Sequence, residues 1–118
     1  MILRWAALGR RSRALSDAEP MDFIFHRRIQ RDLRSALLFY DDEGGPKLGD
    51  RFFAEAEQAT MEVVRNPEGF HFIASGLRRA SLKSFPYHFV FEVVDGEVRF
   101  LVLRHDKRHP DFGLRRQF

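Results

Sequence analysis

The residue types best suited to chemistry gather in the last third of the chain, between Arg78 and Pro110. Histidine titrates near neutral pH and can transfer protons, and Arg or Lys can stabilise a developing negative charge. The candidate catalytic residues are Arg79, Lys83, Tyr87, His88 and His105. This set could in principle supply the chemistry of RNA cleavage, with a base of near-neutral pKa and cations for a developing dianion.

The same residues also allow a purely structural interpretation. Arg79 and Lys83 on a strand would more often form a solvated face or protect a sheet edge. His88 and His105 are each more often surface histidines than catalytic ones. The functional interpretation therefore depends on the fold bringing these groups to one face.

The sequence offers little for a metal or a cofactor. His105 and His109 have the spacing of zinc ligands on a helix, but Pro110 argues against a helix there and no third ligand is evident. The sequence has no Cys and no motif for a P-loop, a dinucleotide loop, a nucleophile elbow or paired carboxylates. We therefore expect no metal site and no cofactor.

Three strands should carry the candidate residues, over 77–85, 87–94 and 97–105. Asp95-Gly96 lies between two alternating apolar runs, which favours a two-residue hairpin turn with positive φ at both positions. This turn sets a register that starts at Val94–Glu97, passes through Phe91–Phe100 and ends at Tyr87–Arg104.

That register sorts the side chains of the hairpin onto two faces, because side chains alternate along a strand. The face expected under the helices contains Phe89, Phe91, Val93, Val98, Phe100 and Val102, and the other contains His88, Val90, Glu92, Arg99, Leu101, Leu103 and His105. Arg79 and Lys83 would join the second face. An uncovered face of mixed basic and apolar character is a place for a partner to dock. The candidate partner-binding residues are Arg79, Val90, Arg99, Leu101, Leu103, Arg104 and Arg108.

The remaining elements must support this sheet. Residues 22–26 alternate as a short strand. A first helix should run from about Arg28 and stop at the acidic, glycine-containing stretch 41–45, and a second should begin at Pro46 and end at Asn66-Pro67. The order β-α-α-β-β-β predicts an α+β domain, with a helical hairpin packed on one face of an antiparallel sheet.

Length and composition fit one globular domain. The chain has 118 residues, of which 44% are hydrophobic and 31% charged, and no apolar run approaches the ~20 residues that a membrane span needs. We expect residues 1–20 to be a disordered extension or the product of a start codon assigned too early, and residues 21–118 to form the domain. Residues 1–20 hold four Arg against Asp17 and Glu19, so the remainder carries a net charge of only +1. Net charge alone is therefore poor evidence for nucleic-acid binding.

Three motifs follow one another in the expected elements. The second helix ends in Asn66-Pro67-Glu68, Arg78-Arg79 precedes Leu82-x-x-Phe85-Pro86-Tyr87, and the chain continues to Val102-Leu103-Arg104-His105-x-x-Arg108-x-Pro110. In this order and spacing, residues 22–112 resemble the RelE/ParE family of bacterial toxins, often called plasmid stabilisation proteins. The resemblance implies a RelE/ParE-like fold and a toxin of a type II toxin–antitoxin system in the cytoplasm. A cognate antitoxin would neutralise it in a hetero-oligomer.

Two mechanisms occur in that family. RelE-like members cut mRNA in the ribosome with basic residues plus Tyr or His, whereas ParE-like members block DNA gyrase. The Phe-Pro-Tyr step and the closing His-x-x-Arg-x-Pro are more similar to the ParE-like branch, and the balanced charge favours a protein target. We therefore expect gyrase inhibition, with ribosome-dependent mRNA cleavage as the alternative. A non-toxic interaction or nucleic-acid-binding domain is a second alternative.

Overall fold

The computed structural model describes residues 21–118, so the expectation for residues 1–20 lies outside the described part of the chain. The elements are β1 (Asp22–Phe25), α2 (Ile29–Gly44), α3 (Pro46–Arg65), a 3-10 turn (Pro67–Gly69), β2 (Phe72–Ala74), β3 (Leu77–Ser81), β4 (Tyr87–Val94) and β5 (Glu97–His105). The sheet order is β1-β5-β4-β3-β2, in which β1 is parallel to β5 and the other pairs are antiparallel. The predicted α+β class is confirmed, with one additional short strand, β2.

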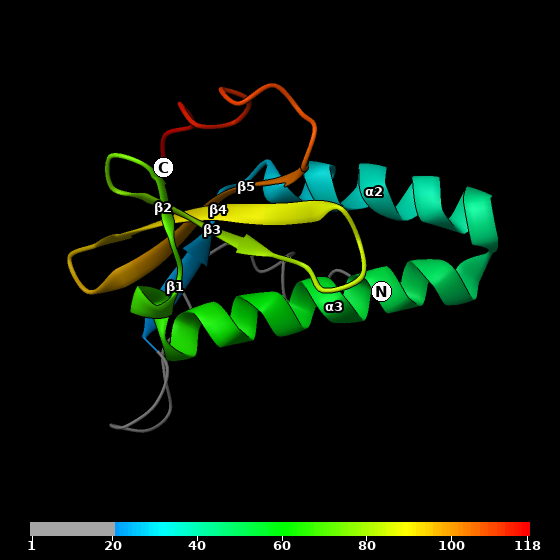
Figure 1. The fold of residues 1–118 in the computed structure, drawn as a ribbon, viewed down its shortest axis with the longest axis horizontal. Helices are drawn as coiled ribbons and strands as arrows, with labels where there is room; N and C mark the ends of the chain where they lie inside the picture. Colours follow the sequence, from blue (N-terminus) through cyan, green and yellow to red (C-terminus); the bar gives the residue numbers. More distant parts are fainter. Residues whose placement is uncertain (1–20) are drawn as a thin grey trace.

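The two helices form the predicted hairpin along the sheet (Figure 1). Their buried stripes are Ile29, Leu33, Ala36 and Leu37 on α2, and Phe52, Ala56, Ala59 and Val63 on α3. Gly45 has φ of +83° and Pro46 is the first residue of α3, so the connection between the helices is very short. Within residues 21–118, no helix has the length and apolarity to cross a bilayer.

The predicted register is correct from the turn to Phe91–Phe100 and wrong beyond it. A bulge on β5 makes Val90 pair with Val102, and Tyr87 then lies opposite His105. One extra residue reverses the faces of everything after it. Leu103 therefore joins the core under the helices, while Val102 moves to the opposite face.

Two further differences concern strand ends. β3 stops at Ser81 instead of continuing to residue 85. The bond from the N–H of Leu82 to the carbonyl of Tyr87 is the last one toward β4, because the chain then turns back, the N–H of Tyr87 bonds to the carbonyl of Phe85, and Pro86 has no N–H to donate. Val93 was expected in the core but is 40% exposed. It lies next to the Asp95–Gly96 turn, where the hairpin extends past the helices (Figure 1).

Candidate functional site

The face of the sheet opposite the helices is covered by the chain's own C-terminal segment, residues 106–118. Phe112 and Leu114 pack against a small core of Val90, Leu101 and Val102. Gly113 has φ of +80°, and a Cβ there would lie 2.6 Å from a methyl carbon of Val102, so the segment crosses the sheet at a distance that only glycine allows.

The prediction of an uncovered face is therefore wrong. Of the candidate partner-binding residues, Val90 is 0% exposed and Leu101, Leu103 and Arg104 are also buried. For Val90 and Leu101 the physical reason is the segment after Pro110, whose Phe112 and Leu114 pack over them. Leu103 is buried because the bulge turns it toward the helices. Arg79, Arg99 and Arg108 keep some exposure. Arg99 pairs with Glu97 at 3.0 Å, and Arg108 lies over the Phe112 ring.

A chain of polar side chains crosses this face, buried at Arg104 and His88 and partly exposed at Asp106 and Arg79. The Nε–H of Arg104 donates to Nε2 of His88 at 2.9 Å, and Nδ1 of His88 lies 2.8 Å from Oδ1 of Asp106. The guanidinium of Arg79 contacts the same carboxylate oxygen at 3.2 Å. Because Arg104 must donate, Nε2 of His88 is the acceptor and its Nδ1–H donates to Asp106.

His88 is held neutral by this environment. His88 is 1% exposed, and this burial lowers its pKa. The hydrogen bond to Asp106 raises the pKa, but by less than burial lowers it. Both ring nitrogens already have partners, so neither is available to a substrate proton. His88 thus anchors the structure at this position and does not reach a surface where it could act as a base.

Arg104 fixes the C-terminal segment to β5. Its Nη1 donates to the carbonyl oxygens of Pro110 at 2.7 Å and Phe112 at 2.9 Å. The candidate residues Arg79, His88 and Arg104 are therefore brought together, but as a clamp that holds the segment on the sheet.

A second clamp was not predicted from the sequence. Arg116 makes a two-point contact with Asp32 of α2, at 2.7 and 3.0 Å, and both side chains are nearly buried. Arg116 also donates to the carbonyl of Leu101, and Asp32 accepts the N–H of Leu103. The pair thus satisfies backbone groups around the bulge. Little in the sequence indicated this pair, because Asp32 lies among several arginines near the start of α2 and any of them could have been its partner.

Tyr87 and His105 meet on the helix side of the sheet. Their ring centroids are 5.2 Å apart, and Tyr40 of α2 lies 6.1 Å from Tyr87. Burial raises the pKa of Tyr87 and of Tyr40, and the nearby Arg108 opposes that rise at Tyr87. Nδ1 of His105 accepts the N–H of Lys107.

The five candidate catalytic residues therefore do not form one site. Tyr87 and His105 lie on one face, His88 and Arg79 on the other, and Lys83 is exposed in the turn after β3, beside a small hollow that Glu55 and Glu62 also line. In the part of the chain that the structure describes, no three His, Cys, Asp or Glu side chains are grouped to hold a metal ion.

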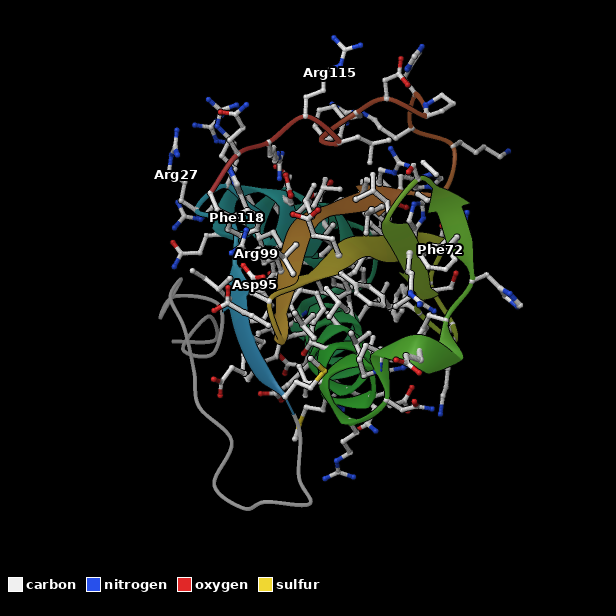
Figure 2. All side chains as sticks on the ribbon, turned by 90° about the vertical axis from the view of Figure 1, so that its left-hand side faces the viewer. Arg27, Phe72, Asp95, Arg99, Arg115 and Phe118 are labelled. Carbon is white, nitrogen blue, oxygen red and sulfur yellow. The ribbon has the colours of Figure 1, made fainter. Side chains whose placement is uncertain are left out.

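Two exposed apolar surfaces remain. Leu38 and Phe39 on α2 are 62% and 53% exposed, and Phe72 and Ile73 on the edge strand β2 are 58% and 39% exposed. Figure 2 shows Phe72 at the edge of the sheet opposite Phe118 and Arg27. Neither surface was predicted from the sequence.

The arrangement defines a class of fold, an α+β domain in which a helical hairpin covers one face of a mainly antiparallel sheet. A chain of the solved structure "Chromosomal ParDE TA system from P. aeruginosa" has the same fold, with a TM-score of 0.64 over 70% of this chain and 92% of that chain, at 16% sequence identity. The ParE-like fold that the motifs imply is thus confirmed. No protein-family model and no curated protein matches the sequence.

Proposed function

We propose that this protein is the toxin of a type II toxin–antitoxin system of the ParE-like branch and acts in the cytoplasm on DNA gyrase. The observation that carries the proposal is the fold, shared over nearly the whole length of a chain from a ParDE system. The RelE/ParE motifs support it from the sequence.

The proposed antitoxin surface is the outer side of α2 around Leu38 and Phe39. These neighbouring side chains are large, apolar and more than half exposed, so together they offer apolar surface that a partner could bury. A short amphipathic helix or an extended segment of the antitoxin would bury them in a hetero-oligomer. This site replaces Leu101, which the C-terminal segment covers, and Leu103, which is buried in the core under the helices.

Gyrase is favoured over mRNA as the target because the candidate catalytic groups are dispersed. Cleavage by general acid–base chemistry needs proton-transfer groups within reach of one reacting phosphate. His88 is enclosed, and Arg79 lies on the opposite face of the sheet from Tyr87 and His105, where it pairs with Asp106. Inhibition by surface contact needs no such grouping.

One specific observation keeps the ribonuclease alternative testable. Tyr87 and His105 are adjacent and half-exposed, with the exposed Arg108 nearby. If they form a cleavage site, replacing either should abolish activity.

Inducible expression in bacteria distinguishes these functions. We expect growth arrest with a DNA-damage response, intact mRNA, and rescue by an antitoxin encoded beside this gene. Ribosome-dependent mRNA cleavage that is lost in both Tyr87→Phe and His105→Gln would move the protein to the ribonuclease branch. Unimpaired growth would favour a non-toxic interaction domain.

A matched pair of variants tests the antitoxin surface. Leu38→Asp should weaken the antitoxin complex and leave the fold intact, since Leu38 is 62% exposed. Val93→Asp introduces the same charge at an exposed apolar residue at the far end of the hairpin and should bind the antitoxin normally. Equal affinity of the two variants would place the interface elsewhere.

A further inference from the structure

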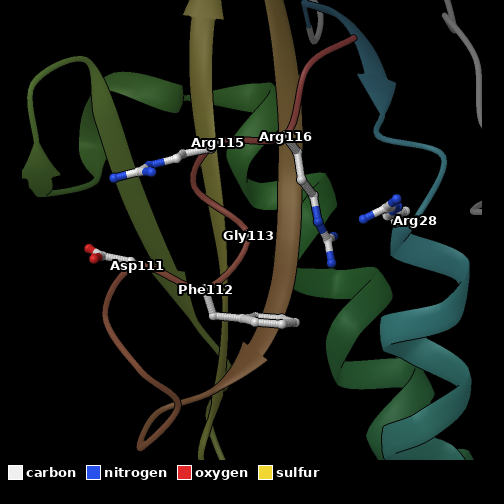
Figure 3. A pocket seen from close by; sticks show the side chains of 6 residues that line it. All are labelled: Arg28, Asp111, Phe112, Gly113, Arg115 and Arg116. Carbon is white, nitrogen blue, oxygen red and sulfur yellow. The ribbon is translucent and has the colours of Figure 1, made fainter.

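Four arginines lie on the first two turns of α2 and immediately before it. Arg27, Arg28, Arg31 and Arg34 are exposed and line one shallow hollow of about 450 Å³, which we call the arginine surface. Arg28 also lines two adjoining hollows together with Arg115 and Arg116 of the C-terminal segment. Figure 3 shows Arg28 and Arg116 pointing toward each other across one of them, while Arg115 points away beside Asp111.

The charge of this surface is not balanced by its neighbours. Asp32 is the acidic residue in the first turn of α2, and Arg116 takes both of its carboxylate oxygens. Among residues 21–118, no salt bridge is formed by Arg27, Arg28, Arg31 or Arg34. The four guanidinium groups therefore face water together.

This placement is unfavourable for the helix itself. The N-terminus of a helix carries a partial positive charge and is stabilised by acidic side chains, whereas cations there are unfavourable. The N-cap position is Arg28, which makes no capping side-chain bond. The acidic Asp32 in the first turn offsets only part of this positive charge, so an anionic ligand would relieve the remaining repulsion.

The groups present select phosphates over bases. Guanidinium groups bind phosphate oxygens with two parallel hydrogen bonds. Guanidinium groups already lie over the bordering aromatic rings, so these rings are not free to stack on bases. Arg108 and Arg116 lie over Phe112, and Arg99 lies over Phe118. A single strand is held mainly by stacking of its bases on free rings, whereas duplex DNA presents its phosphates and keeps its bases inside.

The spacing along the helix also suits a row of phosphates. Arg31 and Arg34 are three residues apart on α2, so they lie on the same side of the helix, and Arg27 stands two residues before its first residue. At a rise of about 1.5 Å per residue, Arg31 and Arg34 are about 4.5 Å apart along the helix axis, which is similar to the roughly 3.4 Å per phosphate along one strand of duplex DNA.

We propose that the arginine surface binds the phosphate backbone of duplex DNA without reading its sequence. The inference does not depend on toxicity or on the antitoxin, because it concerns the purified chain and DNA alone.

Binding should be measured by fluorescence anisotropy with a labelled 24-base-pair duplex of arbitrary sequence, using the full chain. If four phosphate contacts form, the logarithm of the binding constant should fall with the logarithm of salt with a slope of about −3.6. Raising the salt from 50 to 200 mM should then weaken binding about 150-fold. The affinity at physiological salt should be in the non-specific range, with a Kd of roughly 10⁻⁴ to 10⁻⁶ M.

The decisive comparison uses two triple variants that remove the same charge. Arg27→Ala/Arg31→Ala/Arg34→Ala should weaken binding at least ten-fold at 50 mM salt and reduce the slope to about −0.9. Lys47→Ala/Arg51→Ala/Arg65→Ala changes three exposed cations of α3 instead and should retain most of the affinity and slope. Circular dichroism melting curves confirm that both variants fold.

Two results would overturn the proposal. Equal losses in the two triple variants would show that only net charge matters. A single-stranded DNA or RNA of the same length that binds as tightly as the duplex would show that stacking, and not the duplex backbone, is recognised.

Discussion

Replacing Arg104 with Met should loosen the C-terminal segment on the sheet, where Arg116 and Phe112 still hold it. Met nearly preserves the volume of the arginine stem but removes the guanidinium. The loss includes the bond to His88 at 2.9 Å and those to the carbonyls of Pro110 and Phe112 at 2.7 and 2.9 Å. Arg104 is 8% exposed and His88 is 1% exposed, so Nε2 of His88 cannot easily turn to water instead.

The expected loss follows from these contacts. Hydrogen bonds to charged groups contribute about 1.5–3 kcal/mol each, but they are not additive within one network. Leaving a buried acceptor without its donor costs about 1–3 kcal/mol, and this change leaves three such acceptors. We therefore expect Arg104→Met to lower the free energy of unfolding by about 3–5 kcal/mol, a large part of the 5–15 kcal/mol typical of a domain.

Urea denaturation followed by circular dichroism measures this loss, with Arg65→Met on the exposed side of α3 as the control. The control should change stability by less than about 0.5 kcal/mol. Limited trypsin digestion should also cut the variant faster after Arg108 and Arg115, because the loosened segment becomes accessible. A loss below about 1 kcal/mol together with unchanged digestion would refute the clamp.

Three further predictions concern other parts of the molecule. Burial lowers the folded-state pKa of both His88 and His26 below the 6.5 of an unfolded histidine, so the unfolded chain binds more protons in acid. The contribution of the two histidines to the free energy of unfolding should be fully present above pH 6.5, and below that pH the free energy should fall by up to about 2.7 kcal/mol per pH unit. His88→Gln should flatten this dependence on pH, measured by urea denaturation, while His71→Gln, at an exposed histidine, should not. Phe100→Ala should cost about 3–5 kcal/mol in urea denaturation, because Phe100 is 0% exposed and stacks on Phe25; a loss below 1.5 kcal/mol would contradict its place in the core. In growth assays normalised to soluble protein, Arg79→Ala and Arg108→Ala should each weaken toxicity in part and His105→Ala should retain most of it, whereas a complete loss in His105→Ala alone would contradict a surface-contact mechanism.

The helices and the first half of the hairpin were predictable because one signal defined each of them. The apolar stripes of α2 and α3 repeat over several turns, and Asp95-Gly96 fixes the turn. The bulge was not predictable because Leu101, Val102 and Leu103 are all apolar. Alternation cannot reveal an extra residue inside a continuous apolar run, since either register buries apolar side chains.

The site was harder to predict than the fold for the same reason. The shift at the bulge turned Arg104 toward His88 and His105 toward Tyr87, which separated groups that the unshifted register placed together. The C-terminal cover was also hidden, because Pro110 and Gly113 are typical of a loop and Phe112 and Leu114 form too short a pattern to identify alone. β2 is three residues long and fully exposed, so it has no alternation of burial to recognise.

The outer face of α2 links the two proposed binding surfaces. Arg31, Arg34 and Leu38 are spaced by three and four residues, so they lie on the same side of the helix. A partner that covers Leu38 and extends two helical turns, about 11 Å, toward the N-terminus would also cover Arg31. An antitoxin bound there would therefore compete with duplex DNA for α2, and adding antitoxin should displace the labelled duplex in the anisotropy assay. A ternary complex of toxin, antitoxin and DNA that still depends on Arg31 and Arg34 would show that the two surfaces are used independently.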